Sequence, residues 1–269
     1  MGKSYKMAMI FFIVILLTGC SSSAANIEIM DFQAAIDLKS PEPVPDTRPK
    51  ILFVGTSHTS YNNLSEIFVN IVDAFDRKSK VCELSTRYYS LKRYANSEDK
   101  GGALLEQALT TQNWDFVILQ ENTNMALTES AEEEMFPSAR ILDEKIKEAG
   151  GQTMFLMTWA PKEGIQKHKR EDIQTQLATS YISIANELEG LLIPAGVGFM
   201  RCSELYPEIE LWDSDGYHAS PAGTYLAACT IYAILYQESP ENCSYIGNLE
   251  AEQALALQQI AAGLVFHNN

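Results

Sequence analysis

The sequence predicts an α/β fold, a three-layer α/β/α sandwich built around a five-stranded parallel sheet. Two patterns support this prediction. Short, almost wholly apolar runs alternate along the chain with longer segments in which apolar residues recur at helical spacing. Strands that are apolar on both faces are typical of a parallel sheet covered by helices on both sides. The stretch 49–269 also has a size at which a single domain buries a substantial core.

Five short runs are the predicted strands. The first, 50–54, has the sequence KILFV and ends at Gly55. The others are 82–89, 115–119, 153–157 and 191–193. Runs of this length are shorter than most helices, and each is followed by a change to polar or turn-forming residues. We therefore expect five parallel strands whose carboxyl ends meet at one edge of the sheet.

Helices are predicted between the strands. The segment 63–74 carries apolar residues on one helical face, at Leu64, Ile67, Phe68, Ile71 and Val72. Similar patterns cover 104–109, 132–148 and 173–189, and two further helices follow Pro221 and Leu249. This alternation of strand and helix favours right-handed crossovers, which place helices on both faces of the sheet.

The N-terminus carries an export signal. Lys3 and Lys6 precede an apolar run, 7–18, which is too short to span a bilayer but has the length of a signal-peptide core. The run ends in LTGC, which resembles a lipobox, the site at which bacterial lipoproteins are cleaved and acylated. We expect residues 1–19 to be a signal peptide and Cys20 to be lipidated. The globular part would then be anchored to a bacterial membrane outside the cytoplasm, in the cell envelope.

A polar and then proline-rich segment, 20–48, separates Cys20 from the first strand. Proline stiffens a chain and removes backbone hydrogen-bond donors, so the segment is predicted to be a tether. No repeat and no second linker follows it. The expected organisation is a signal peptide (1–19), a tether (20–48) and a single domain (49–269).

The charge balance limits the possible partners. Thirty-five acidic residues against twenty basic ones give a net charge of −15, which argues against nucleic acid as a partner. The acidic cluster 129–134 has no histidine beside it, so a solvated helix face is expected there and no metal site. Cys20 aside, the cysteines are Cys82, Cys202, Cys229 and Cys243. An exported protein permits disulfides, and the three pairings of four cysteines stay open.

Polar residues with catalytic potential follow the predicted strands. Ser57 comes two residues after the first strand and Gly55, at the start of a helix whose amide groups favour negative charge. Near the C-terminus, Asp215 precedes His218 by three residues, a spacing that allows the carboxylate to fix the imidazole tautomer. A helix-capping role is the alternative for Ser57 alone. Together the three residues indicate a nucleophile with its base.

This ordered set resembles the SGNH (GDSL-like) hydrolase superfamily, over most of the chain from Lys50 to about Tyr236. The resemblance implies a flavodoxin-like sandwich with a catalytic Ser57, His218 and Asp215. It also implies an oxyanion hole formed by the amide of Ser57, the amide of Gly102 (or its neighbour Gly101) and the side chain of Asn122. Gln120 is an alternative to Asn122. Two residues depart from the family pattern: Thr56 replaces the usual Asp, and Gln120-Glu121-Asn122 replaces Gly-x-Asn-Asp.

The expected function is hydrolysis of an acyl ester by this triad, with no metal and no organic cofactor. Location and resemblance favour O-acetyl or other short acyl groups on a glycan as substrate. Trp159 and Tyr217 could stack on a sugar ring, or be ordinary packing residues. Two alternatives stay open: a catalytically silent glycan- or cell-wall-binding lipoprotein, and a lipase or thioesterase that acts on longer acyl chains.

Overall fold

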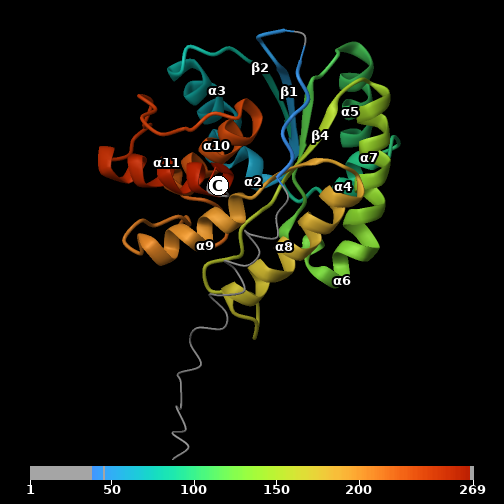
Figure 1. The fold of residues 1–269 in the computed structure, drawn as a ribbon. Coiled ribbons are helices and arrows are strands. Elements are labelled where there is room, and N and C mark those ends of the chain that lie inside the picture. Colours follow the sequence, from blue (N-terminus) through green and yellow to red (C-terminus); the bar gives the residue numbers. More distant parts are fainter. Residues whose placement is uncertain (1–37, 45, 267–269) are drawn as a thin grey trace, which may run out of the picture.

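The computed structural model describes residues 38–44 and 46–266, and their centre is a parallel sheet (Figure 1). The strands are β1 (Lys50–Gly55), β2 (Lys80–Ser85), β3 (Phe116–Leu119), β4 (Gln152–Leu156) and β5 (Leu191–Ile193). Their order is β2-β1-β3-β4-β5, and every neighbouring pair is parallel. The predicted fold class is therefore confirmed, and β1 lies beside both β2 and β3 inside the sheet.

Helices cover both faces of the sheet and enclose two hydrophobic cores. On one face lie α3 (Leu64–Ala74), α9 (Ala195–Leu205), α10 (Pro221–Tyr236) and α11 (Ala251–Phe266). On the other lie α4 (Leu91–Ala95), α5 (Lys100–Thr111), α7 (Phe136–Glu148) and α8 (Arg170–Glu187). Short helical turns connect them: α2 (Ser57–Ser60), η1 (Tyr61–Asn63), η2 (Thr123–Ala126), α6 (Thr128–Ser130) and η3 (Ala131–Met135).

Several boundaries differ from those predicted. The second strand covers Lys80–Ser85 and not 82–89, because the chain turns immediately afterwards, where the Tyr89 amide donates to the Thr86 carbonyl over 3.2 Å. The helix expected over 132–148 is divided, since the π-helical turn η3 precedes α7. Helices α4 and α9 were not predicted, because α4 is short and α9 directly follows β5.

Part of the predicted tether lies against the domain. Leu38 and Val44 pack on the hydrophobic core, and the backbone of Glu42 exchanges two hydrogen bonds with the side chain of Gln152 at the start of β4. Residues 38–44 therefore lie against the folded body. The predicted signal peptide, Cys20 and the tether as far as residue 37 lie outside the described residues.

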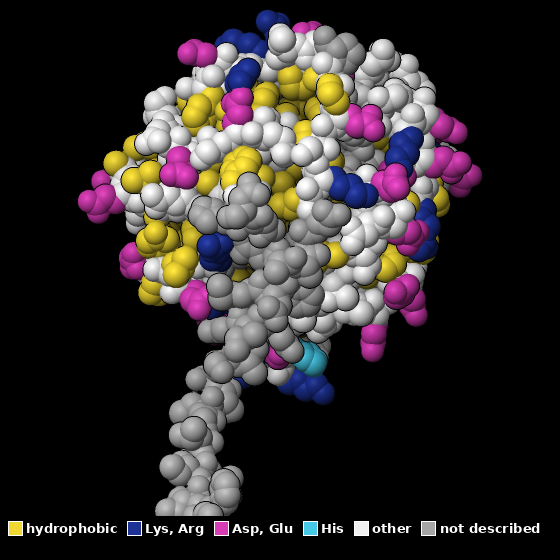
Figure 2. All heavy atoms as spheres, in the orientation of Figure 1, with side chains coloured by type: hydrophobic (Ala, Val, Ile, Leu, Met, Phe, Trp, Pro, Cys, Tyr) yellow, Lys and Arg dark blue, Asp and Glu magenta, His cyan; other side chains and the backbone are white. Residues whose placement is uncertain are grey.

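The surface and the cysteines add two observations. On the face shown in Figure 2, acidic side chains are spread around the periphery and basic ones lie between them, without a continuous basic stripe outside the grey residues. Cys82, Cys202, Cys229 and Cys243 are free thiols.

Within the described part of the chain, no helix combines the length and apolar character that crossing a membrane requires.

Candidate active site

The site begins where β1 ends. Thr56 caps helix α2, which starts at Ser57, and the Thr56 carbonyl accepts hydrogen bonds from the amides of Thr59 and Ser60 at 3.1 and 3.2 Å. Ser57 is partly exposed, whereas the residues on both sides of it are buried. We call Gly55–Thr59 the nucleophile turn. It presents the Ser57 hydroxyl at the carboxyl edge of the sheet, where ligands of open parallel sheets bind.

Gln120 fixes the nucleophile turn from the neighbouring strand. Its Oε1 accepts hydrogen bonds from the Thr56 amide at 2.8 Å, the Thr56 hydroxyl at 3.1 Å and the Thr59 hydroxyl at 2.9 Å. Its Nε2 donates to the Glu121 carbonyl at 2.6 Å and to the Thr56 hydroxyl at 3.1 Å. A side chain on Gly55 would collide with Thr59 Oγ1 at 2.2 Å and Gln120 Oε1 at 2.7 Å, which explains the glycine. Gln120 is fully buried and fully bonded, so it anchors the turn and has no donor left for an oxyanion.

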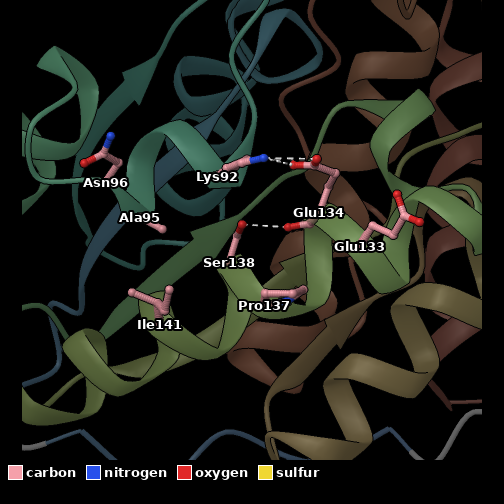
Figure 3. Close-up of a pocket in the computed structure, with 8 residues that line it drawn as sticks. All are labelled: Lys92, Ala95, Asn96, Glu133, Glu134, Pro137, Ser138 and Ile141. Atoms are coloured by element: carbon pink, nitrogen blue, oxygen red, sulfur yellow. Dashed lines mark hydrogen bonds and ion pairs between the residues drawn. The ribbon is translucent and has the colours of Figure 1, made fainter.

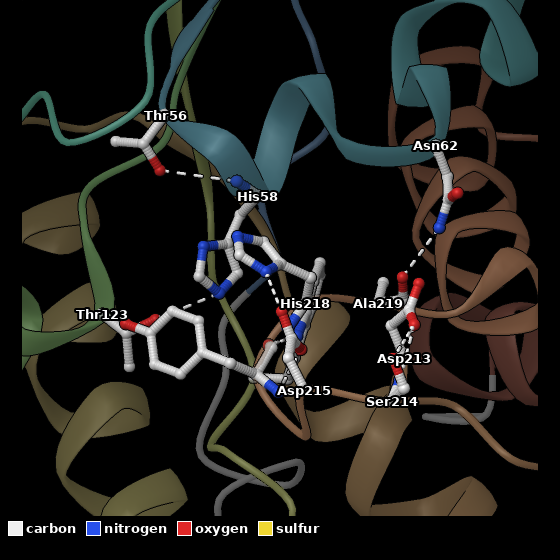
Figure 4. A network of polar contacts seen from close by, with 11 residues as sticks. Thr56, His58, Asn62, Thr123, Asp213, Ser214, Asp215, His218 and Ala219 are labelled. Atoms are coloured by element: carbon white, nitrogen blue, oxygen red, sulfur yellow. Dashed lines mark hydrogen bonds and ion pairs between the residues drawn. The ribbon is translucent and has the colours of Figure 1, made fainter.

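Asp215 and His218 lie in a loop, Asp213–His218, which we call the base loop. Asp215 Oδ2 lies 2.6 Å from His218 Nδ1, and Asp215 Oδ1 accepts from the amides of Tyr217 and His218 at 2.8 and 2.9 Å. Burial opposes the ionisation of Asp215, but these hydrogen bonds outweigh it and lower its pKa to about 2. The carboxylate is thus ionised at neutral pH and holds the imidazole by Nδ1 (Figure 4).

The free nitrogen of His218 points into the site. Its Nε2 is buried and has no hydrogen-bond partner, and no hydrogen bond joins it to Ser57. The His218 ring stacks on Tyr61, with centroids 4.5 Å apart, and lies 5.4 Å from the ring of His58. His58 follows Ser57 directly. Tyr61 lies four residues, or one helical turn, after Ser57 and therefore on the same side of the turn as Ser57. The contacts of His218 therefore bring it to the residue directly after the predicted nucleophile and to the residue four positions after it.

His58 is a site residue that the sequence did not indicate. It is 2% exposed, and its ring lies 5.2 Å from Trp159 and 5.0 Å from Tyr217. Its Nε2 lies 3.4 Å from Thr123 Oγ1, and its Nδ1 is buried without a partner. Burial lowers the pKa of His58 to about 3, and a protonated His218 would lower it too. His58 is therefore neutral at pH 7 and contributes a dipole, not a charge, beside the base.

The loop after β3 supplies Asn122 and a buried acid. Asn122 Oδ1 caps the turn η2 by accepting from the Asn124 amide at 3.0 Å, which leaves its Nδ2 as an available donor. Glu121 is fully buried and accepts from the amides of Leu91 at 3.0 Å and Asn122 at 2.6 Å. Burial nevertheless raises the pKa of Glu121 to about 8. In the sequence, the polar triplet Gln120-Glu121-Asn122 directly follows the wholly apolar strand β3, and this pattern could have indicated buried polar groups.

Gly101 and Gly102 have a packing role in the structure. Both lie in the first turn of α5, and no hydrogen bond of the described residues joins them to the nucleophile turn. A Cβ on Gly102 would lie 1.8 Å from the Asn96 carbonyl oxygen. A Cβ on Gly101 would lie 2.4 Å from the ring of Tyr89. Close packing against the residues that flank α4 thus accounts for these glycines, and the oxyanion role expected of the Gly102 amide stays a prediction.

Trp159 is a packing residue. It is 1% exposed, stacks on Phe199 with centroids 4.3 Å apart, and donates from Nε1 to the Tyr217 carbonyl over 3.1 Å. A buried indole covered on one face by Phe199 favours the packing alternative for Trp159 over the contact with a sugar ring. Tyr217 is partly buried, and its ring meets His58 edge to face. Both aromatic residues therefore support the two histidines.

The described residues offer no metal-binding cluster beside this site. No cluster of three or more His, Cys, Asp or Glu side chains among them could bind a metal ion. The cavity in Figure 3, about 240 Å³, lies between α4 and α7 and not at Ser57. Lys92 and Glu134 pair across it, so one member of the acidic cluster 129–134 is partly neutralised. The site of interest remains the meeting point of the nucleophile turn and the base loop.

Comparison with known proteins defines the fold. No protein-family model and no curated protein sequence matches this chain. It is similar to the structure of a candidate SGNH hydrolase from Slackia heliotrinireducens, with a TM-score of 0.60, 26% identity, and coverage of 70% of this chain and 98% of that chain. The fold is that of the SGNH hydrolases.

Two further structures share this SGNH-like fold. One is a DUF4886 family protein from Bacteroides uniformis, with a TM-score of 0.68, 18% identity, and coverage of 82% of this chain and 96% of that chain. The other is the esterase EstA from Pseudoalteromonas sp., with a TM-score of 0.53, 15% identity, and coverage of 71% and 98%. At these identities the likeness concerns the architecture of the chain and not its substrate.

Proposed function

We propose that this protein is a serine ester hydrolase in which Ser57 is the nucleophile, His218 the base and Asp215 the residue that orients the base. The observation that carries this proposal is the state of His218. Its Nδ1 is held by an ionised carboxylate and its Nε2 is buried and unpaired, while its ring lies beside His58 and Tyr61, one and four residues after Ser57. A base in this state needs a proton donor, and a partly exposed serine hydroxyl is the natural one.

The proposed reaction has two acyl-transfer steps. Ser57 Oγ attacks the ester carbonyl carbon as its proton passes to His218 Nε2. The imidazolium then gives this proton to the departing alcohol oxygen, which leaves an acyl-enzyme. Water repeats the sequence and releases the acid and the free serine. Asp215 stays ionised throughout and stabilises the imidazolium. Hydrogen bonds of this kind often tighten only when substrate binds, so a loose Ser57–His218 contact is compatible with the mechanism.

The oxyanion of each tetrahedral intermediate needs donors on the far side of Ser57 from the base. We assign this role to the Ser57 amide, at the N-terminus of α2, and to Nδ2 of Asn122. The rigid anchoring of the turn by Gln120 favours such a role, because preorganised donors stabilise the transition state without reorganisation. Gln120 and Glu121 shape the loop that carries Asn122, and we place neither in contact with substrate.

The proposed substrates are O-acetyl or other short acyl esters of a glycan. Acylation of Cys20 would place the domain at a bacterial membrane surface in the cell envelope, where such esters occur. This assignment rests on the resemblance of the N-terminal segment to lipoprotein signals. Replacement of Cys20 by Ser should release the protein from the membrane fraction and remove the acyl mass measured by mass spectrometry. Membrane association that survives this change would contradict the proposed anchor.

The triad is tested with an activated acetate ester and a fluorophosphonate probe. Ser57→Ala and His218→Ala should each abolish hydrolysis and labelling, while the thermal midpoint stays close to that of the wild type. Ser60→Ala is the matched control, because Ser60 lies in the same helix α2 and should keep full activity. Substantial turnover by the Ser57 variant would refute the assignment.

The same assay separates the two alternatives. A catalytically silent binding protein would neither hydrolyse any ester nor react with the probe at Ser57. A lipase or thioesterase would prefer long acyl chains, so rates on nitrophenyl esters of increasing chain length would rise. We expect the reverse order, with acetate the best substrate.

A further inference from the structure

The loop after β2 lies beside the nucleophile turn. β1 and β2 run in parallel register, with Gly55 opposite Ser85, and the Thr86 amide continues the pairing by donating to the Gly55 carbonyl over 3.1 Å. Thr86 therefore follows the paired strands at the carboxyl edge of the sheet, and Arg87 and Tyr88 are the central residues of the turn that begins there. The strands are neighbours in Figure 1 as well.

A second observation ties this loop to the base. Tyr61 stacks on the His218 ring. A hydrogen bond to Asp213 raises the pKa of Tyr61, and the positive charge of Arg87 in the loop after β2 opposes this rise. Arg87 is exposed and forms no ion pair within the described residues. The loop thus borders the site from the side of β2.

Tyr88 is strained. Its φ is +63°, a left-handed backbone conformation that is costly for a bulky side chain and that glycine adopts freely. The strain comes from a turn in which the Tyr89 amide donates to the Thr86 carbonyl and Tyr88 is the third residue. At this position such turns favour glycine or asparagine. A tyrosine here therefore lowers stability, unless its side chain recovers the cost by a contact.

No contact within the described chain recovers that cost. Tyr88 is 90% exposed, and its ring and hydroxyl have no hydrogen bond, ion pair or ring contact with the described residues. The two nearby tyrosines differ, because Tyr89 donates to Asp99 and Tyr94 donates to the Gly55 carbonyl. Strained residues that persist without local compensation tend to occur where a ligand makes use of them.

We propose that Tyr88 is the specificity-determining residue for a ring-bearing substrate: its phenol ring stacks on the sugar ring that carries the scissile ester. The inference rests on the proposed esterase function and names the alcohol part of its substrate. Trp159 and Tyr217 are engaged by packing, which leaves Tyr88 as the exposed aromatic side chain next to the nucleophile turn. In this proposal Arg87, which forms no ion pair within the described residues and carries five N–H donors, bonds the hydroxyl groups of the same sugar.

Three variants separate the ring from the strain. Tyr88→Ala removes the ring and keeps most of the backbone strain, Tyr88→Gly removes both, and Tyr88→Phe keeps the ring. The readout is the ratio of kcat/KM for a mono-O-acetylated methyl glucoside to kcat/KM for ethyl acetate, measured on the full chain. Ala and Gly should lower this ratio roughly 3- to 10-fold through a higher KM for the sugar ester, the factor expected for one aromatic contact.

Tyr88→Phe should keep the ratio, and Tyr88→Gly should raise Tm above that of the wild type. Phe266→Ala, at a partly exposed aromatic residue at the end of α11, is the control that should leave the ratio unchanged. An unchanged ratio in both ring-deleted variants would overturn the proposal. So would an equal loss on both esters, since that would report on the shape of the turn and not on the ring.

Failure of the esterase proposal is detected separately. If the wild type hydrolyses neither ester, the binding of an O-acetylated trisaccharide is measured by saturation-transfer NMR on the wild type and Tyr88→Ala. Binding that the Ala variant loses would support the role of Tyr88 in a non-catalytic protein. Equal binding, or none by the wild type, would reject it.

Discussion

The nucleophile turn and the base loop meet at one edge of the sheet, but contacts of different range shape them. In the nucleophile turn, the buried Thr56 and Thr59 are held by Gln120, which lies more than sixty residues further along the chain. In the base loop, Asp215 bonds groups no more than three residues away, and its side chain is 45% exposed. One half of the site is therefore part of the core, and the other is a local motif at the surface.

This difference implies that variants in the two halves of the site affect stability and activity differently. Changes in the base loop should alter chemistry with little effect on folding, since few contacts of the core are lost. Changes at the anchor of the nucleophile turn should affect both, because three donors lose a buried acceptor at once. The contrast can be tested by comparing the free energy of unfolding with kcat for matched variants on the two sides.

The largest expected effect is on the base loop. Asp215→Asn removes the charge that fixes the tautomer of His218 and stabilises its imidazolium, so kcat should fall on the order of 10⁴-fold. The free energy of unfolding should change by less than about 1 kcal/mol, because the side chain is nearly half exposed. Asp213→Asn is the control in the same loop and should retain most of the activity. A large loss of stability in Asp215→Asn would show that the base loop is not a local motif.

The second effect is on the anchor. Gln120→Ala leaves the Thr56 amide and two hydroxyl groups without their acceptor in a buried site, which should cost about 4 kcal/mol in the free energy of unfolding. Activity should fall as well, since Ser57 loses its fixed position. Gln107→Ala, on the exposed side of α5, should cost less than about 0.5 kcal/mol in urea unfolding. A stable and inactive Gln120 variant would instead suggest a direct catalytic role.

The same contrast explains what the sequence could predict. Apolar runs that alternate with helical patterns are properties of single segments, and they were sufficient for the fold and for the order of its elements. The Asp215–His218 contact was predictable because it spans three residues. The anchor by Gln120 was not, because it depends on the register of β1 against β3, which no single segment determines.

Other features that the sequence did not predict have the same origin. The packing role of Gly102 depends on its neighbour in space, the Asn96 carbonyl, which the order of motifs does not reveal. His58 and Glu121 are buried polar groups whose partners come from other elements. Tyr88 is distinguished by its positive φ, and a backbone angle cannot be read from a sequence.

The third effect tests the loop that joins the anchor to the proposed oxyanion hole. Asn122→Ala removes the Nδ2 donor, and kcat should fall roughly 100- to 1,000-fold, with a smaller change in KM. Asn122 also caps η2, so part of the change could reflect a moved loop. Asn122→Asp is the matched variant, since it keeps the capping oxygen and lacks the donor. Equal losses of kcat in the Ala and Asp variants would attribute the effect to the missing Nδ2 donor. A mostly active Asp variant would reject the oxyanion role of Asn122.

The smallest effect is a pH dependence that belongs to the nucleophile side alone. The pKa of Glu121 is raised from 4.5 to about 8, chiefly by burial, so between these values the folded protein holds a proton that the unfolded chain releases. Its stabilising contribution is therefore complete below pH 4.5 and is lost as the pH rises through 8. From pH 5 to pH 7 the free energy of unfolding should fall by about 2 kcal/mol from this group. Glu121→Gln removes the titration.

The difference between wild type and Glu121→Gln isolates this contribution from other titrating groups. His58, with its pKa lowered to about 3, has the opposite effect: it adds stability as the pH rises from 3 to 6.5 in both proteins and so cancels in the difference. The charge of Glu134, which raises the pKa of Glu121, is also common to both. Urea unfolding of both proteins at four pH values between 5 and 8 gives the difference in their free energies of unfolding as a function of pH. A difference that does not vary with pH would mean that Glu121 is ionised in the folded protein throughout, and that its two backbone donors outweigh its burial.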